Sequence, residues 1–173
     1  MGTLVSEKVD IGVNVLEQSV TGTANWVFQL ALKIASLRGL SPDHIVGKRE
    51  IIEKGLFTWL AEQTLEGISI EIFDARRNDA FERFDFIFTY RAEADTTVRN
   101  PDVSRVEEFC RTLRKLPAGT TYRVVVSVGA GATVIEGWCV DEFLPLDVTN
   151  EQLLSDHGFG VIGTQVTYRG GAW

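Results

Sequence analysis

Glu71 and Asp85 are two carboxylates that invite a catalytic interpretation. Each alternates to the polar face of a predicted strand, and the two strands face each other across a polar turn. Paired carboxylates perform general acid–base catalysis when their surroundings separate their pKa values. Carboxylates on an exposed face are more often solvated, so a small enzyme with a carboxylate site is an alternative and not the preferred interpretation.

The other reactive side chains lack the neighbours that catalysis or metal binding requires. Ser127 and Cys110 lie in no nucleophile elbow and beside no recognisable base. His44 and His157 have no second histidine or cysteine at ligand spacing, which argues against a metal site. The loop at residues 129–131 follows a strand but lacks the Lys and Ser/Thr of a P-loop, so we predict a plain turn and no cofactor.

Composition and charge favour one cytoplasmic domain over residues 1–173. The chain carries 24 acidic and 17 basic residues, a net charge of −7, which argues against nucleic acid or an anionic membrane as the main partner. Two cysteines, Cys110 and Cys139, form no disulfide framework, and we expect both to be buried. No apolar run has the length of a membrane span or the pattern of a signal peptide.

Hydrophobic periodicity divides the N-terminal third into a strand and two helices. Residues 5–18 alternate apolar and polar side chains at the period of a half-buried strand. From Trp26 onward, an apolar stripe at helical spacing predicts a helix that ends before Gly39. The Ser-Pro-Asp sequence at residues 41–43 is typical of a helix start, and a second helix is predicted to about residue 63.

A β-hairpin and a third helix follow. Residues 65–73 and 81–90 alternate at period two around a polar turn, which predicts two antiparallel strands. The Asn-Pro-Asp sequence at residues 100–102 opens a third helix, and Pro117 ends it.

Two further strands are predicted before the C-terminal segment. Residues 122–128 (YRVVVSV) are dominated by β-branched side chains and form the strongest strand of the chain. Residues 134–143 predict another strand. The fold class is therefore α+β, with a mostly antiparallel sheet backed by three helices.

The C-terminal residues 158–173 (GFGVIGTQVTYRGGAW) read as a glycine-rich β-strand with no helix after it to cover its edge. Glycines weaken the pairing register, so such a strand could pair in more than one place, and we interpret it as a moving part. Alternate side chains lie on opposite faces: Val161, Gly163, Gln165 and Thr167 on one, and Ile162, Thr164, Val166 and Tyr168 on the other.

Six segments occur together in one order along the chain. They are RGLSPDHI at 38–45, FTWL at 57–60, ISIEIFD at 68–74, FERFDFIFTY at 81–90, TTYRVVVSV at 120–128 and IEGW at 135–138. In this combination the chain resembles the bacterial HORMA-domain proteins encoded beside cyclic-nucleotide antiphage (CBASS) operons.

The resemblance implies a noncatalytic peptide sensor. HORMA proteins switch between an open form and a closed form, in which a C-terminal safety belt wraps a short closure-motif-type peptide that has been added to the sheet as an edge strand. In the CBASS setting the closed protein activates a nucleotidyltransferase that makes a cyclic oligonucleotide, and an AAA+ remodelling ATPase resets it.

The implied site can be mapped onto this chain. Residues 1–20 would be the mobile end that the ATPase grips, residues 21–150 the core and residues 151–173 the belt. The peptide-receiving strand would be Tyr122, Arg123, Val124, Val125, Val126, Ser127 and Val128. The belt residues would include Phe159, Gly160, Val161, Ile162, Gly163, Val166, Tyr168 and Trp173, of which Trp173 either packs across the closed belt or touches a partner.

Strand pairing alone would bind a peptide weakly. Six added backbone hydrogen bonds contribute about 3 to 9 kcal/mol, whereas association costs about 4 to 15 kcal/mol. A belt that closes over the peptide slows its escape and so raises affinity through the dissociation rate. The alternative binding module is a constitutive scaffold that never switches, which size-exclusion chromatography would reveal as a single species.

Overall fold

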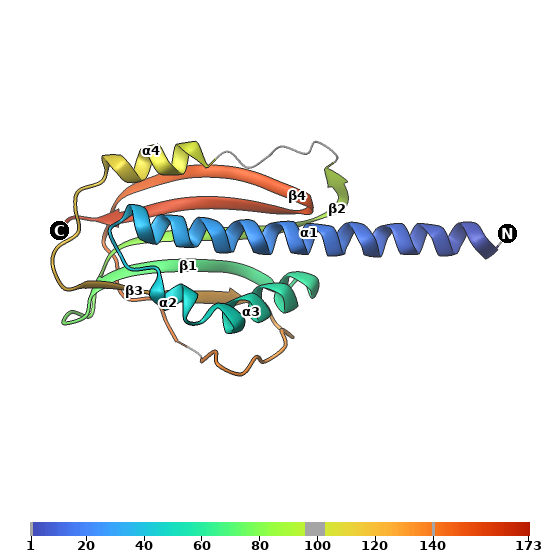
Figure 1. The fold of residues 1–173 in the computed structure, drawn as a ribbon, viewed down its shortest axis with the longest axis horizontal. Coiled ribbons are helices and arrows are strands. Elements are labelled where there is room, and N and C mark those ends of the chain that lie inside the picture. The colour runs from blue at the N-terminus through green and yellow to red at the C-terminus, as the bar shows by residue number, and fades with distance from the viewer. Residues whose placement is uncertain (1, 96–102, 140) are drawn as a thin grey trace.

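The computed structural model describes the backbone of residues 2–95, 103–139 and 141–173, and the side chains of these residues from Val15 onward except 94 and 95. A four-stranded antiparallel sheet in the order β3-β1-β2-β4 carries helices on one face (Figure 1). The elements are α1 (Gly2–Leu37), α2 (Asp43–Val46), α3 (Arg49–Ala61), β1 (Leu65–Asp74), β2 (Ala80–Asp95), α4 (Ser104–Thr112), β3 (Thr120–Val128) and β4 (Val148–Gly171).

Residues 5–18 form no strand, so that prediction is wrong: they are the first half of the 36-residue helix α1. Most of this half of α1 runs past the end of the sheet (Figure 1), and near its end Val15 meets the tip of β4 at Gly160. A strand there would leave its backbone groups unpaired, whereas a helix closes its hydrogen bonds internally. The predicted end is confirmed, because Gly39 follows α1 with a φ of +73° that favours glycine.

The second predicted helix is two helices. Four-residue α2 and 13-residue α3 are separated at Gly47 and Lys48, and Lys48 has a φ of −112° that interrupts helical geometry. The break lets both pieces bury apolar side chains, Ile45 from α2 and Leu56 and Trp59 from α3.

The predicted β1–β2 hairpin is confirmed, and its two faces differ. Ile70 pairs with Phe84 and Ile68 with Phe86, and all four side chains are buried beneath the helices. On the opposite face Ser69 pairs with Asp85. One face of the sheet is therefore the apolar core, and the other carries polar and charged groups.

The C-terminal strand prediction is confirmed, and β4 is longer than predicted. It folds back on itself, as Figure 1 shows, so that Arg169 donates to Glu151 at 2.9 Å and Gln165 to Asp156 at 3.4 Å. The chain reverses around Gly160, which has a φ of +55°. The returning arm pairs with β2, and Ile162, Thr164, Val166 and Tyr168 are all buried.

Residues 134–143 do not form the predicted strand; apart from Val140, which lies outside the described residues, they are irregular. Their β-branched and aromatic side chains favoured a strand, but Gly137 has a φ of +96° and Cys139 is exposed, contrary to expectation.

The predicted helix start at residues 100–102 lies outside the described residues, and the helix itself is α4. It ends before Pro117, because Leu113 is already extended.

Candidate functional site

β3 is an edge strand of the sheet. In the described part of the chain it pairs only with β1. The Gly129 amide donates inward to the Thr64 carbonyl at 2.7 Å, and backbone groups alternate between the two edges of an antiparallel strand. Tyr122, Val124 and Val126 therefore direct their N–H and C=O groups outward, away from β1.

The side chains of β3 are held by both layers of the fold. The Tyr122 hydroxyl donates to the Ser41 carbonyl at 2.7 Å, and its ring stacks on His44 with centroids 5.2 Å apart. Val124 and Val126 pack against the core, opposite Ile70 and Ile68. The polar face of the strand carries Arg123, Val125 and Ser127, and the Ser127 hydroxyl donates to Glu66 at 3.1 Å. Val128 lies at the exposed end of the strand.

Residues 129–147, which we name the strap, leave the end of β3 and run first along α3. The Trp59 indole donates to the Thr133 carbonyl at 2.8 Å, and the Trp138 indole donates to the Ile51 carbonyl at 3.2 Å. The two tryptophan rings meet edge to face at 5.5 Å. Ile135 of the strap is buried in the core. The first half of the strap is therefore fastened to helix α3.

The second half of the strap crosses the polar face of the sheet. Arg123 of β3 forms an ion pair with Asp141 and donates to the Glu142 carbonyl at 2.5 Å. The Leu144 amide donates to Glu71 of β1 at 2.7 Å. Farther along, the Arg83 guanidinium of β2 stacks on the Phe143 ring, 4.0 Å from its centroid. The strap thus runs from β3 over β1 to β2 before it enters β4.

The strap passes the outer edge of β3 without pairing with it in the described residues. Among the described residues, no backbone hydrogen bond joins residues 130–139 to the outer edge of β3. Figure 1 shows the strap as the orange loop that passes outside β3. The Tyr122 carbonyl lies 3.5 Å from the His44 Nδ1 atom of α2. The outward groups of Val124 and Val126 face a segment that encloses the edge and, among the described residues, does not pair with it.

The predicted belt residues lie at the opposite edge, on β2, with β1 and β2 between them and β3. Buried polar contacts hold them there. The Tyr168 hydroxyl donates to Glu82 at 2.9 Å, and Glu82 forms an ion pair with Arg38 at 2.5 Å, with both side chains of the pair almost fully buried. Burial first, and the Glu82 carboxylate second, raise the pKa of Tyr168, so the hydroxyl stays protonated as a donor.

The reversal of β4 rests on α1. The Val161 amide donates to the Ser19 hydroxyl at 3.2 Å. A Cβ placed on Gly22 would lie only 2.8 Å from the Phe159 ring, so glycine allows the two elements to approach closely. Phe159 also meets His157 at 4.9 Å. Helix α1 therefore supports the tip of the hairpin.

The other belt residues pack within the molecule. Val166 pairs with Phe86 in the core, and Gly163 opposite Thr89 leaves no room for a side chain, since a Cβ there would meet the Thr89 hydroxyl at 2.5 Å. Trp173 lies against Phe81, with ring centroids 5.3 Å apart. Of the two roles considered for Trp173, the structure has it packed against its own chain.

The expectation that Glu71 and Asp85 are exposed is wrong. Glu71 is fully buried and accepts from Arg123 at 2.6 Å, and Asp85 accepts from Ser69 at 2.5 Å and from Arg83 at 2.8 Å. Arg169 also donates to Asp85, at 3.0 Å. Glu71 is thus paired with one arginine and Asp85 with two, as in a structural ion-pair network. Burial also raises the pKa of Cys110 to about 11, so this thiol is not an activated nucleophile.

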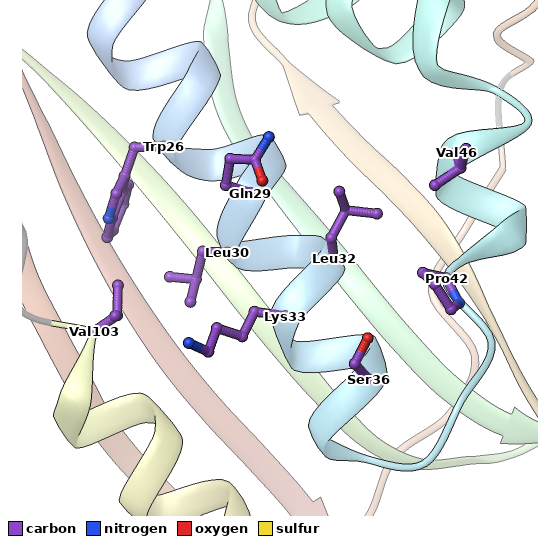
Figure 2. Close-up of a pocket in the computed structure, with 9 residues that line it drawn as sticks. All are labelled: Trp26, Gln29, Leu30, Leu32, Lys33, Ser36, Pro42, Val46 and Val103. Atoms are coloured by element: carbon purple, nitrogen blue, oxygen red, sulfur yellow. The ribbon is translucent and has the colours of Figure 1, made fainter.

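A second surface feature is an open groove of about 450 Å³ among α1, α2 and the start of α4. Figure 2 shows Trp26 and Leu30 of α1 at one end and Pro42 and Val46 at the other. Its lining is mostly apolar, as on many protein contact surfaces. The groove lies on the helical side of the fold and is separate from the β3 edge.

The described side chains contain no group of three or more His, Cys, Asp or Glu residues that would hold a metal ion. Within the same residues, no helix combines the length and the apolar character that crossing a membrane requires.

The strap was missed by sequence reasoning. Its anchors Trp138, Asp141 and Leu144 fell within or beside a predicted strand. The alternation that is typical of a strand does not reveal whether the segment will find another strand to pair with. The usable clue was the unusual glycine content around this segment, at Gly129, Gly131 and Gly137, which disfavours a continuous strand.

Several solved structures share this fold. A chain of the mitotic checkpoint complex has a TM-score of 0.74 at 13% identity, covering 90% of this chain and 99% of that one. C. elegans HTP-2 bound to the HIM-3 closure motif has a TM-score of 0.67 at 13% identity, covering 91% and 93%. The E. coli MS115-1 HORMA:CdnC:Trip13 complex has a TM-score of 0.54 at 12% identity, covering 90% and 87%.

The sequence family described as bacterial HORMA domain 2 matches residues 8–169. The chain belongs to this bacterial HORMA family. The match spans β1, β2 and β3, all but the last two residues of β4 and most of α1, so the HORMA domain includes both the β3 edge and the β4 hairpin. Comparison with curated protein sequences gives no match.

Proposed function

We propose that this HORMA domain is a noncatalytic peptide-sensing adaptor of an antiphage CBASS system in the cytoplasm. A short extended peptide adds to the outer edge of β3, under the strap, and the peptide-bound protein binds and activates a nucleotidyltransferase that makes a cyclic oligonucleotide. An AAA+ ATPase resets it. The observation that carries this proposal is a strand edge with which no other described strand pairs, enclosed by a strap that is anchored on both sides of it.

The geometry of β3 supports strand addition. Tyr122, Val124 and Val126 offer three outward N–H groups, and Val124 and Val126 offer two outward C=O groups, because the Tyr122 carbonyl already lies 3.5 Å from the His44 Nδ1 atom. Together these five groups contribute about 2.5 to 7.5 kcal/mol net when paired. Because association costs about 4 to 15 kcal/mol, the strap must add to the affinity. It does so by covering the peptide on its outer side and slowing dissociation.

The β4 hairpin acts as the fastening of the strap. The strap is continuous with β4, so it opens widely only if β4 leaves the edge of β2. The contacts of Ile162, Val166 and Tyr168 oppose that step. We therefore propose that belt residues 159–168 control peptide release from a distance, and not by touching the peptide.

Helix α1 is the proposed handle for the ATPase. Its N-terminal half projects beyond the rest of the fold (Figure 1), where a remodelling enzyme can reach it. The same helix supports the hairpin tip through Ser19 and Gly22. Pulling α1 away would remove that support and loosen β4.

Two similar structures support the choice of partners. The HTP-2 structure contains a closure motif, and the E. coli HORMA structure contains CdnC and Trip13. At 12 to 13% identity these structures share the fold, and their partners are proposed for this chain by analogy.

Peptide display tests the proposal. Random nine-residue peptides are selected on the immobilised protein, and the selected peptide is then added to the protein together with the nucleotidyltransferase from the same genome. We expect the peptide to protect β3 amides from hydrogen exchange and to raise the output of cyclic nucleotide. If no peptide is selected, or if output is the same with and without peptide, the sensor proposal is wrong; output without peptide would favour the constitutive scaffold.

An N-methyl scan of the selected peptide tests strand addition itself. Each methyl group removes one backbone donor, and every second donor of an added strand faces β3. We expect affinity to fall about 5-fold at alternate positions and to change little between them. A flat profile would show that the peptide binds in some other way.

A further inference from the structure

The charged side chains of the strap are all acidic. Residues 129–147 contain Glu136, Asp141, Glu142 and Asp147, and no Lys, Arg or His. All four of these acidic residues are exposed. At the C-terminal end of β3, the exposed Glu66 of β1 adds a further carboxylate beside Ser127.

The described chain does not neutralise this charge. Arg123 is the one basic residue of β3, and its guanidinium already contacts Glu71 and Asp141. Within the described residues, no basic side chain forms an ion pair with Glu66, Glu136 or Glu142. The carboxylates of Glu66, Glu136 and Glu142 therefore carry negative charge that no ion pair within the described residues balances, whereas Asp141 is paired with Arg123.

Helix α3 adds no positive charge where it meets the strap. The strap contacts Ile51, Gly55, Trp59 and Glu62 of this helix. A Cβ on Gly55 would lie 3.0 Å from the Trp138 indole nitrogen, so the two segments are in close contact here. The basic groups of α3 thus do not supply the missing charge at these contacts.

The two faces of β3 differ in chemistry. Val124 and Val126 continue the apolar core on the helical face. On the polar face, Arg123 lies beside Asp141 and Glu142, and Ser127 lies beside Glu66. A strand added to this edge would continue both faces, with apolar side chains on one and side chains near carboxylates on the other.

We infer that the peptide is basic and amphipathic, which rests on the proposed strand addition at β3. It carries apolar side chains at alternate positions, facing the helices, and Lys or Arg on the opposite face. Arg123 and Ser127 are four residues apart, about 13 Å along a strand. Two basic residues spaced i, i+4 therefore lie near strap residues 141–142 at one end, where Arg123 contacts the Asp141 carboxylate and the Glu142 carbonyl, and near the Glu66 carboxylate at the other.

The charges set the specificity more than the affinity. Exposed ion pairs are individually weak, so two of them change affinity by roughly 3- to 20-fold. An acidic peptide would meet like charges along the strap, and its exclusion adds to the discrimination. The net charge of −7 for the whole chain also favours the approach of a basic partner.

The test uses the full chain and the random nine-residue peptide display described above. We expect the selected peptides to be enriched in Lys or Arg at i, i+4, with apolar residues between them. A synthetic peptide of the selected sequence is then compared with one in which norleucine replaces each basic residue. We expect the basic peptide to bind roughly 3- to 20-fold more tightly at low salt, and the difference to vanish near 0.5 M salt, a concentration at which exposed charges are screened.

A matched pair of variants locates the effect. The Glu66→Gln/Glu142→Gln double variant should lose the preference for the basic peptide, whereas Glu17→Gln/Glu93→Gln, which removes the same charge at exposed positions away from β3, should keep it. Selection of acidic or uncharged peptides, or an unchanged preference in the first variant, overturns this inference while leaving strand addition intact. Failure to select any peptide overturns the proposed function and this inference with it.

Discussion

Residues 129–171 are one continuous stretch of chain that lies along the outer edges of both β2 and β3. It pairs with β2 but not with β3 in the described residues. At β2, the returning arm of β4 pairs residue by residue, from Ile162 opposite Tyr90 to Tyr168 opposite Phe84. At β3, the strap is anchored to α3 and to the polar face of the sheet but leaves the strand edge unpaired. We call the β2 edge, which is paired with β4, the sealed edge. We call the β3 edge, which the strap surrounds without pairing in the described residues, the enclosed edge.

The two edges differ in the free energy needed to separate them from the chain that covers them. Opening β2 exposes the buried side chains of Ile162 and Val166 and separates Tyr168 from Glu82. Opening the strap breaks the partly exposed hydrogen bonds of Arg123 and Trp138 and exposes the buried side chain of Ile135. An edge that is enclosed but unpaired can accept a guest strand, whereas the sealed edge decides whether the enclosure holds.

Replacing Glu82 by alanine should have the largest effect, because it breaks the sealed edge. Arg38 would keep a buried charge without its carboxylate, and Tyr168 would lose its acceptor. We expect the free energy of unfolding to fall by about 3 to 5 kcal/mol, measured by urea denaturation. Glu93→Ala, at an exposed carboxylate of the same strand, should change it by less than about 0.5 kcal/mol. A similar small loss in both variants would mean that the pair does not secure β4.

Replacing Trp138 by alanine should weaken the enclosed edge. The variant loses the ring contact with Trp59 and the hydrogen bond to the Ile51 carbonyl, so the strap is less firmly held. We expect a selected peptide to dissociate roughly 10- to 100-fold faster in surface plasmon resonance, with little change in association rate. The control is Val134→Ala in the same strap, where the side chain is 93% exposed. Equal dissociation rates in the two variants would exclude a role for the strap.

Gly22→Val should loosen the hairpin tip at the sealed edge. The added side chain would meet the Phe159 ring, and overpacking of this kind costs about 1 to 3 kcal/mol. We expect faster hydrogen exchange in residues 158–162 and unchanged exchange in β3. Asn25→Val introduces the same residue at an exposed position of α1 and should leave the tip unchanged. If both variants exchange alike, α1 does not support the hairpin.

Acidification should have the smallest effect. Burial lowers the pKa of His157, which packs against Phe159 and Trp26 at the tip of β4. Because the folded pKa lies below the unfolded value of about 6.5, the unfolded chain takes up the proton first, and stability present above pH 6.5 is lost as pH falls. Hydrogen exchange in residues 158–162 should rise from pH 7 to pH 5.5, after correction for the intrinsic rates. His157→Gln should remove this additional rise; its persistence would assign it to another group.

The candidate site was predictable in part. The strand at residues 122–128 was evident because β-branched residues dominate it, and alternation placed Ile162 and Val166 on one face of the C-terminal arm, which the structure shows to be buried. The strap and the ion pairs of Glu71 and Asp85 were not evident. Arg123 reaches Glu71 across 52 positions and Arg169 reaches Asp85 across 84, and although Arg83 is only two positions from Asp85, nothing local shows that this carboxylate is buried.

Local chemistry in the sequence determined the hairpin, the strand at β3, the end of α1 at Gly39 and the acidic character of the strap, because each depends on neighbouring residues alone. Tertiary structure decided that residues 5–18 are helical and that residues 134–143 are irregular, because a strand persists only where another strand supplies its hydrogen bonds. It also decided which edge of the sheet is covered. That choice depends on where residues 148–171 find their burial, and only the assembled core at β2 offers a matching apolar surface.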